Sequence, residues 1–316
     1  MRASVIICTF NRALSLKNSL KSIDKLIVPD NWPWELLVID NNSSDVTRQI
    51  VESFSSNTKL KVKYFFEKQQ GLSNARNRGI KESKGDIIAF SDDDMDFHPD
   101  WLFHIITTFD EFNCLCVAGK IVPKWKCQKP SWIIETGPYR TRDFHGGFDL
   151  GGQTRDINRA PFGGNMAFKR TVFDRYGVFR TDMGKSGLNL MSNEETELCQ
   201  RLFLDGKSIM YNPKAIVYHL ISEEQTLKSY YLKRNFSHGK SVARMSIYPD
   251  HTIYYFGIPK VLYRKLFSNS VKWLLTFKPH VRFYYKQNLY HILGKMEEHF
   301  DRWKRNKGNG KTEFSL

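Results

Sequence analysis

The chain has 316 residues, of which 41% are hydrophobic and 26% charged, and its formal net charge is +15. This length and composition predict a folded globular protein with one large domain, or one domain with an appendage. The five cysteines are an odd number and Cys114-Leu-Cys116 lacks the spacing of a zinc knuckle, so we expect reduced thiols rather than a disulfide framework or a metal site. The apolar run Val5–Phe10 is too short for a signal peptide, and no run approaches the ~20 residues that cross a bilayer.

The first part of the chain alternates between short apolar runs and helical patterns. Strands are predicted at Ser4–Thr9, Glu35–Asp40, Lys61–Phe66 and Asp86–Ser91, and helices at Ala13–Ile23, Asp45–Phe54 and Leu72–Ser83. This alternation predicts an α/β fold with a mostly parallel sheet flanked by helices. Such sheets bind ligands at the carboxyl ends of their strands.

Polar clusters stand where three of these strands end. They are Thr9–Arg12, Asp40–Asp45 and the triplet Asp92–Asp94. We expect them to converge on one edge of the sheet and form a site. Two carboxylates in Asp-x-Asp suit Mg²⁺ or Mn²⁺, and such an ion would relieve the repulsion within the triplet. A solvated acidic turn is the alternative for the triplet, and an Asx-turn or helix cap is the alternative for Asp40.

Three later segments add candidate residues. Gly71–Gly79 offers a helix N-terminus and Arg76 for contact with a phosphate or base, against the alternative of a solvated helix face. Asn193–Leu198 places adjacent carboxylates at the start of a helix, where capping is the alternative. The strand Ile209–His219 ends on a histidine that is either a metal ligand or part of the core. Residues 120–165 are predicted to be loops that shape the pocket.

Taken in order, these motifs resemble the inverting nucleotide-sugar glycosyltransferases with the GT-A fold, glycosyltransferase family 2. The resemblance covers residues 2 to about 219. Its signatures are SVIICTFNR, VIDNNSSD, GLSNARNRGI, GDIIAFSDDD, PFGGNMAFKR, NEETELCQRL and the final YH of AIVYH.

The resemblance implies a GT-A (Rossmann-like) fold and a reaction in which a base deprotonates an acceptor hydroxyl, which then attacks the anomeric carbon and inverts it. Glu195 matches the catalytic base, at a position where the family usually has Asp. Asp92, Asp94 and His219 match ligands of a Mg²⁺ or Mn²⁺ ion that bridges the donor diphosphate. The residues expected to contact the nucleoside-diphosphate sugar are Thr9, Asn11, Arg12, Asp40, Arg76 and Asp93, with Gly164 and Asn165 bordering the sugar and acceptor.

Two other functions are weighed against sugar transfer. A nucleotidyltransferase also uses carboxylates, a metal and a nucleotide, but it would prefer a Gly-rich phosphate loop that TFNRALS lacks. A nucleic-acid-binding protein is suggested by the pI of about 9.5. The excess of basic residues lies outside the region that carries the motifs, so we expect no nucleic-acid partner.

Residues 260–311 hold thirteen Lys or Arg against three Asp or Glu, which is +10 of the total charge. We predict a glycosyltransferase domain at 1–225, a basic, aromatic and mainly helical region at 226–311, and a tail at 312–316. We expect the helical region to dock on an anionic membrane surface, with a saccharide or lipid-linked saccharide as acceptor and a cytoplasmic location, peripheral on the inner face of the membrane. The alternative is a C-terminal helix packed on the core. A possible apolar stripe is formed by Leu289, Ile292, Leu293, Met296, Phe300 and Trp303.

Overall fold

The computed structural model describes residues 2–142, 144–187 and 189–308, so the predicted tail at 312–316 lies outside the described residues. The chain forms two compact units. The first comprises Met1–Cys127, His145–Gly187 and Glu194–Ser222, and the second comprises Gln128–Phe144, Leu188–Asn193 and Glu223–Leu316. The single boundary predicted after residue 225 stays a prediction.

The first unit is built on a mixed sheet whose strands follow the order β3-β2-β1-β4-β8-β6-β9-β5, with β7 paired to β9. β1 to β4, β6 and β9 run in one direction and β5, β7 and β8 run against it, which confirms the predicted mostly parallel α/β sheet. The strands are β1 (Ala3–Thr9), β2 (Trp34–Asp40), β3 (Val62–Phe66), β4 (Ile87–Asp92), β5 (Met95–Phe97), β6 (Cys116–Trp125), β7 (Arg155–Ile157), β8 (Met166–Lys169) and β9 (Ile209–Ile221).

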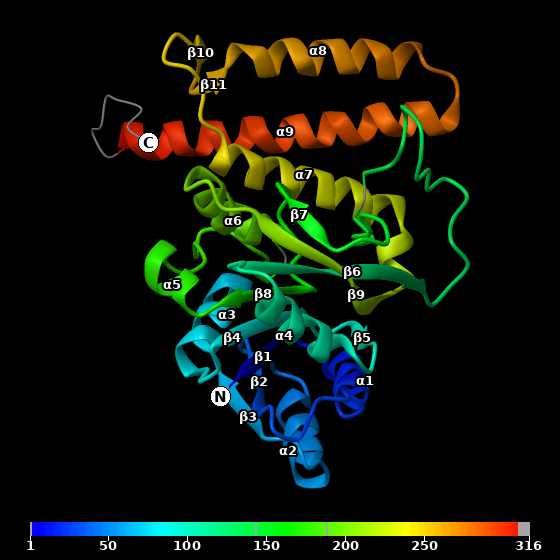
Figure 1. The fold of residues 1–316 in the computed structure, drawn as a ribbon. Coiled ribbons are helices and arrows are strands. Elements are labelled where there is room, and N and C mark those ends of the chain that lie inside the picture. Colours follow the sequence, from blue (N-terminus) through cyan, green and yellow to red (C-terminus); the bar gives the residue numbers. More distant parts are fainter. Residues whose placement is uncertain (1, 143, 188, 309–316) are drawn as a thin grey trace. The chain divides into compact units, whose positions relative to one another are not determined.

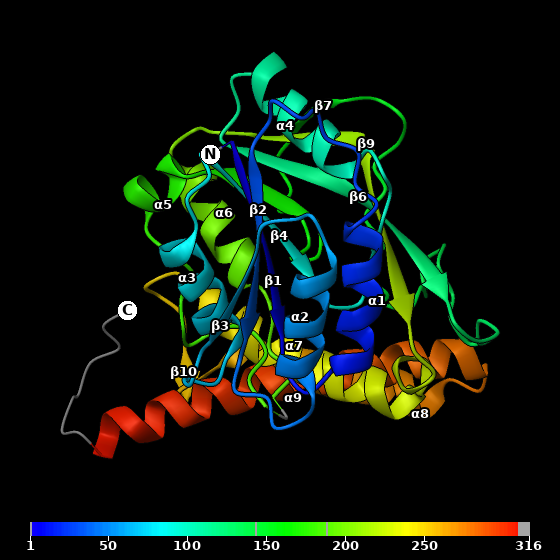
Figure 2. The ribbon, with the colours of Figure 1, turned by 90° about the horizontal axis from the view of Figure 1, so that it is seen from below.

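Helices cover both faces of this sheet. They are α1 (Ala13–Ile23), α2 (Thr47–Asn57), α3 (Leu72–Glu82), α4 (Trp101–Glu111), α5 (Thr171–Tyr176) and α6 (Glu194–Leu204). From β1 to β3 the chain steps outward through α1 and α2, and then returns through α3 to β4 on the other side of β1. Because such crossovers are right-handed, α3 lies on the face opposite α1 and α2 (Figure 2). With both faces covered, every residue of β1 is buried, which explains its continuous apolar run.

Residues 120–165 are less irregular than the sequence predicts. β6 extends to Trp125, β7 lies within the predicted loops, and Ile121 pairs with Phe148. The loop prediction was wrong at β6 because Pro123 counts against a strand. Ile121 donates its N–H to Phe148, on the side of β6 that faces away from β9. The missing N–H of Pro123 would point to the same side, because alternate residues of a strand do so. There β8 no longer pairs with β6, so the proline costs no hydrogen bond to β8.

The second unit is mainly helical, as predicted for the C-terminal region. Its helices are α7 (Lys228–Met245), α8 (Lys260–Leu275) and α9 (Pro279–Gly308). A short 3-10 turn (Glu224–Thr226) precedes α7, and a hairpin of β10 (Tyr254–Tyr255) and β11 (Ile258–Pro259) lies between α7 and α8. α9 packs against both α7 and α8 (Figure 1).

The crossing of α7 and α9 depends on two glycines. A Cβ atom on Gly239 would lie 2.1 Å from the carbonyl oxygen of His291, and one on Gly294 would lie 2.0 Å from that of Phe236. This crossing turns the polar residues Gln287 and Glu298 inward, to 2% and 1% exposure. The predicted apolar stripe is therefore wrong in part: Ile292 is buried, but Leu293 and Phe300 are 41% and 38% exposed.

Candidate functional site

The ends of β1, β2 and β4 bring the three polar clusters together. Thr9 at the end of β1 stands opposite Asp40 of β2, and Cys8 stands opposite Asp92 of β4. Asp93 and Asp94 continue from β4 into the turn before β5. The carboxyl edge of the sheet thus gathers the acidic triplet and the residues after β1, as the strand pattern predicts.

Internal hydrogen bonds hold two carboxylates of the triplet. Asp93 accepts from Thr9 Oγ1 at 2.7 Å and from Arg12 Nη1 at 2.6 Å, while Arg12 Nη2 donates to Asp94 Oδ2 at 2.9 Å. Burial raises the pKa of Asp93 to about 6, although the Arg12 guanidinium acts in the opposite direction. Burial would also raise the pKa of Asp94, but His219 and Arg12 hold it well below its usual value. Arg12 therefore offsets the repulsion within the triplet.

His219 stands beside Asp94 because β9 pairs with β5. His219 is opposite Met95 in this ladder, and its Nε2 lies 3.4 Å from Asp94 Oδ2. Its Nδ1 contacts the carbonyl oxygen of His145, which can only accept a hydrogen bond. Burial would lower the pKa of His219, but the Asp94 carboxylate raises it, so the charged imidazole directs its Nε2 proton at Asp94. Loss of that proton would leave the Nε2 lone pair for a metal ion, with Nδ1 still bonded to the carbonyl.

The residues present fit a divalent cation. Asp94 Oδ1 is buried and has no hydrogen-bond partner, whereas the side chain of Asp92 is 30% exposed. Within residues 2–142, 144–187 and 189–308, no three His, Cys, Asp or Glu residues gather closely enough to hold a metal by themselves. Mg²⁺ sites commonly use one or two carboxylates and complete the shell with water and substrate phosphates. One or two of Asp92, Asp94 and His219 could supply that protein share in this conformation.

Arg76 of α3 joins the triplet to the start of α6. Its Nη1 donates to Glu194 Oε1 at 2.6 Å, and its Nη2 lies 3.5 Å from Asp92 Oδ1. The guanidinium fits only because Gly163 faces it: a Cβ atom on Gly163 would lie 2.2 Å from Arg76 Nη2. Gly164 borders the triplet, since a Cβ atom on it would lie 3.3 Å from Asp92 Oδ2, and its predicted place beside the sugar and acceptor stays a prediction.

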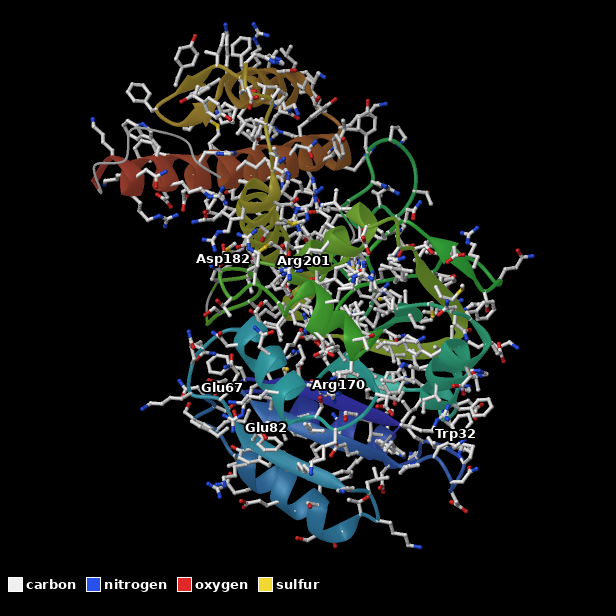
Figure 3. All side chains as sticks on the ribbon, turned by 60° about the vertical axis from the view of Figure 1, so that its left-hand side comes forward. Trp32, Glu67, Glu82, Arg170, Asp182 and Arg201 are labelled. Atoms are coloured by element: carbon white, nitrogen blue, oxygen red, sulfur yellow. The ribbon has the colours of Figure 1, made fainter. Side chains whose placement is uncertain are left out.

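The three glutamates of α6 have different surroundings. Glu194 pairs with Arg76, and Glu197 pairs with Arg201, which is labelled in Figure 3. Glu195 is 8% exposed and makes no ion pair with any described residue. Burial, followed by the neighbouring Glu194 carboxylate, raises the pKa of Glu195 to about 8. Of the three, Glu195 alone combines the absence of an ion pair with a raised pKa, and both are expected of a general base.

Several predicted donor contacts are used within the protein. Asp40 accepts from the backbone N–H of Ser43 at 2.9 Å and from Tyr64 Oη at 2.7 Å, which is the turn role weighed against base or ribose binding. Asn11, at a positive φ of 49°, accepts from the N–H of Ser44 at 2.7 Å.

Asn165 is 0% exposed and its amide is fully engaged. It accepts from Trp101 Nε1 at 2.8 Å and donates to the carbonyl oxygens of Lys120 and Ala215 at 2.9 Å each. These bonds tie β6 to β9 where their register shifts. The amide of Asn165 therefore serves the fold in this structure, and its predicted place at the border of the sugar and acceptor stays a prediction.

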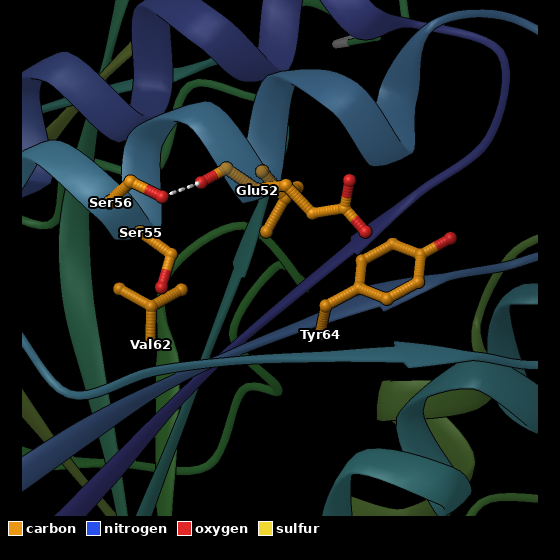
Figure 4. A pocket seen from close by; sticks show the side chains of 6 residues that line it. Glu52, Ser55, Ser56, Val62 and Tyr64 are labelled. Atoms are coloured by element: carbon orange, nitrogen blue, oxygen red, sulfur yellow. Dashed lines mark hydrogen bonds between the residues drawn. The ribbon is translucent and has the colours of Figure 1, made fainter.

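Sequence patterns missed two contributors to the site. The carbonyl of His145 orients His219, and the positive charge of Lys185 lowers the pKa of Asp94 after the larger effects of His219 and Arg12. Both stand in segments without periodicity, where sequence gives no indication of spatial neighbours. A hollow beside α2 and β3 is separate from this edge, because no residue of the acidic triplet lines it (Figure 4). It is lined by Val51, Glu52, Ser55, Ser56, Val62 and Tyr64.

Comparison with known proteins agrees with this geometry. The family model described as "Glycosyl transferase family 2" matches residues 4–177. The glucosyl-dolichyl phosphate glucuronosyltransferase of Haloferax volcanii is 26% identical over 253 residues, covering 79% of each chain. The succinoglycan biosynthesis protein ExoM of Rhizobium meliloti is 25% identical over 240 residues, covering 76% of this chain and 73% of its own.

Among solved structures, the mannosyltransferase PcManGT from Pyrobaculum calidifontis, in complex with GDP-Man and Mn²⁺, superimposes with a TM-score of 0.56 at 16% identity. The match covers 100% of this chain and 76% of that one. At this identity the likeness shows the fold alone, and it confirms the predicted GT-A architecture.

Proposed function

We propose that this chain, which belongs to glycosyl transferase family 2, transfers a sugar from a nucleoside-diphosphate sugar to an acceptor hydroxyl with inversion, in polysaccharide or glycolipid biosynthesis. The observation that carries the mechanism is the contrast at the start of α6. Glu194 is neutralised by Arg76, whereas Glu195 next to it is buried, unpaired and proton-accepting. The catalytic domain is proposed to span 1–225, with 226–311 as a helical appendage.

The chemistry follows from the placement of these carboxylates. Asp92, Asp94 and His219 would hold Mg²⁺ or Mn²⁺, which when bound would neutralise the charge of the departing nucleoside diphosphate. Arg12 fixes Asp93 and Asp94, so these side chains need not reorganise when donor binds. Glu195 accepts the proton of the acceptor hydroxyl as it attacks the anomeric carbon from the side opposite the leaving group.

The donor nucleotide is proposed to lie at the ends of β1 and β2. Asn11 is exposed there, and its positive φ fixes the turn against Ser43 and Ser44. Thr9 and Asp40 shape this edge through Asp93 and the Ser43 turn, rather than by free side chains. Support for a nucleotide-sugar donor and a divalent metal comes from PcManGT, solved with GDP-Man and Mn²⁺.

We propose that α8 docks the protein on an anionic membrane surface. Only Leu262 of this helix is buried. Lysines and arginines alternate along it with exposed apolar residues, so within the basic segment 260–311 we assign the membrane face to α8. The exposed apolar residues are Val261, Phe267, Val271, Leu274, Leu275 and, just beyond the helix, Phe277, and the basic ones are Lys260, Arg264, Lys265, Lys272 and Lys278.

Charge, exposed apolar side chains and one relative support docking with a lipid-linked acceptor, which we place on the cytoplasmic face. Each basic residue near an anionic surface contributes about 1 kcal/mol, and the apolar side chains add burial in the interface. No helix in the described part of the chain is long and apolar enough to cross a membrane. The Haloferax relative is named for a glucosyl-dolichyl phosphate, a lipid-linked sugar.

The test of sugar transfer is a screen of nucleoside-diphosphate sugars by thermal shift with and without Mn²⁺, followed by transfer assays with the sugar that stabilises the protein. We expect one nucleotide class to raise the melting temperature only when Mn²⁺ is present. Stabilisation by no sugar nucleotide would contradict the proposal. Binding of RNA or DNA at moderate salt would instead favour the nucleic-acid function, and incorporation of a nucleotide into product would favour nucleotidyl transfer.

A further inference from the structure

The second unit contains a group of basic side chains that sugar transfer does not use. This cation cluster consists of Arg142, Arg234, His238, His291 and Lys295. Arg142 Nη1 lies 3.5 Å from His238 Nδ1, which lies 3.4 Å from His291 Nδ1, and the two imidazoles stack with centroids 5.1 Å apart. Arg234 precedes His238 by one turn of α7, and Lys295 follows His291 by one turn of α9, so the cluster lies along the glycine crossing.

No carboxylate balances this cluster among the residues that the structure describes. Arg142, Arg234 and Lys295 make no ion pair there, and α7 contains no acidic residue. The nearby carboxylates are taken by other cations: Glu135 by Lys129, Glu297 by Lys240 and Glu298 by Arg244.

The five residues of the cluster are partly exposed, and crowding partly buried cations without a counter-charge is still unfavourable, as the titration behaviour of the cluster reflects. Burial lowers the pKa of Arg142, and it lowers those of His238 and His291 to about 3 and about 2. For Lys295, burial and then the charges of Lys265 and Arg142 lower the pKa.

As far as the structure describes the chain, the same region holds three buried polar atoms without a partner, the donors Gln287 Nε2 and Arg234 Nε and the acceptor Asn235 Oδ1. Gln287 is 2% exposed, and its Oε1 accepts from the backbone N–H of Arg142 at 3.2 Å, which leaves its Nε2 beside the cluster without a partner. Arg234 Nε is also buried and unpartnered. For the side chain of Arg142, the one hydrogen-bond contact within the described chain is the long one to His238. Buried donors of this kind require an acceptor that the described chain does not provide.

We propose that the cation cluster is a binding site for a phosphate group, either a phosphate ester or a diphosphate. The planar fork of Arg142 would bind two of its oxygens, while Gln287 Nε2 and Lys295 would donate to others. A phosphate with three or four oxygens and a double negative charge matches the cations Arg142 and Lys295 and the neighbouring donors better than a carboxylate does. Arg234 stacks over the ring of Phe144 at 5.2 Å, which fixes the wall of the site. This site is independent of the sugar-transfer chemistry in the first unit.

Isothermal titration calorimetry with inorganic pyrophosphate tests the proposal. The full chain is titrated in EDTA, which removes metal-dependent binding to the acidic triplet. We expect saturable binding by the wild type, weakened at least tenfold in Arg142→Gln and also in Lys295→Gln. The matched control is Arg140→Gln, two residues from Arg142 and exposed, which should bind as the wild type does. Far-UV circular dichroism and melting curves establish whether each variant is folded. If Arg142→Gln does not fold, Lys295→Gln provides the test.

The source of the phosphate is distinguished by repeating the titration with a soluble short-chain prenyl diphosphate. Tighter binding than pyrophosphate, lost in Arg142→Gln, would assign a lipid-borne phosphate, whereas equal affinities would assign a free one. Absence of binding by the wild type, or equal affinities for the wild type and both cluster variants, would overturn the site. Sugar transfer would be untouched by that result, because its donor binding is measured separately with Mn²⁺.

Discussion

Glu195→Gln should make the protein more stable and nearly inactive. Gln is almost the same size as Glu and keeps the helix-start position in α6, but it cannot ionise. In the native protein Glu195 is 8% exposed and lies beside the Glu194 side chain, so burial and then the charge of Glu194 make its carboxylate form unfavourable. The substitution removes that unfavourable charge together with the proposed base, so stability and turnover should move in opposite directions.

The magnitude follows from the pKa of Glu195, raised from 4.5 to about 8. Because the folded state binds this proton more tightly than the unfolded state, the wild type loses stability as pH rises from about 4.5 to about 8, and Gln avoids the loss. At 1.36 kcal/mol per pKa unit the full loss would be about 4–5 kcal/mol, and relaxation of the buried site reduces it. We expect about 1–3 kcal/mol, or a melting temperature higher by roughly 3–8 °C at pH 8.5 and unchanged at pH 4.5.

The assay pairs melting curves at these two pH values with transfer kinetics. Loss of a general base should lower kcat about 10²–10⁴-fold with donor affinity nearly unchanged, and should abolish the rise of wild-type kcat/KM towards pH 8. Glu197→Gln is the matched control on the same helix, because it breaks the pair with Arg201 and leaves the base in place. A Glu195→Gln protein that melts lower at pH 8.5 and transfers sugar at the normal rate would show that this glutamate only caps the helix.

Three further substitutions test other parts of the structure. Asp94→Asn should abolish transfer and Mn²⁺-dependent donor binding, and normal turnover would refute the metal assignment. Because the depressed pKa of Asp94 stabilises the fold at neutral pH, the variant should also melt several degrees lower at pH 7 yet remain folded. Gly294→Ala should destabilise the protein by about 1–3 kcal/mol, although Ala normally favours a helix over Gly by about 1 kcal/mol, because its Cβ would meet the carbonyl of Phe236; Gly152→Ala, with nothing within 4 Å, is the control in denaturant melts. Replacing Leu274 and Phe277 of the exposed α8 face by Ser should reduce sedimentation with anionic vesicles about tenfold and spare transfer to a soluble acceptor; equal binding of the wild type to neutral and anionic vesicles, or to neither, would remove the docking idea.

The sheet and the acidic edge could be predicted because each depends on local pattern. Apolar runs such as Val5–Cys8 and Leu36–Ile39 are buried on both faces, and parallel strands bring their carboxyl ends to one edge whatever the intervening loops contain. The partners of the carboxylates could not be predicted in the same way. Whether Arg12 binds a nucleotide or Asp93 depends on a side-chain direction that the cluster Thr9–Arg12 does not encode.

The same distinction explains why the sequence could not tell which helix faces of residues 260–311 are exposed. Helical spacing identifies a stripe, but the faces of α9 that become buried depend on the approach of α7, which Gly239 and Gly294 permit across more than fifty residues of chain. That approach commits the polar face of α9, including Gln287 and Glu298, to the interior. The pair of glycines therefore permits the close packing of α7 and α9 along which the cation cluster lies, because any side chain at either position would meet the backbone of the other helix.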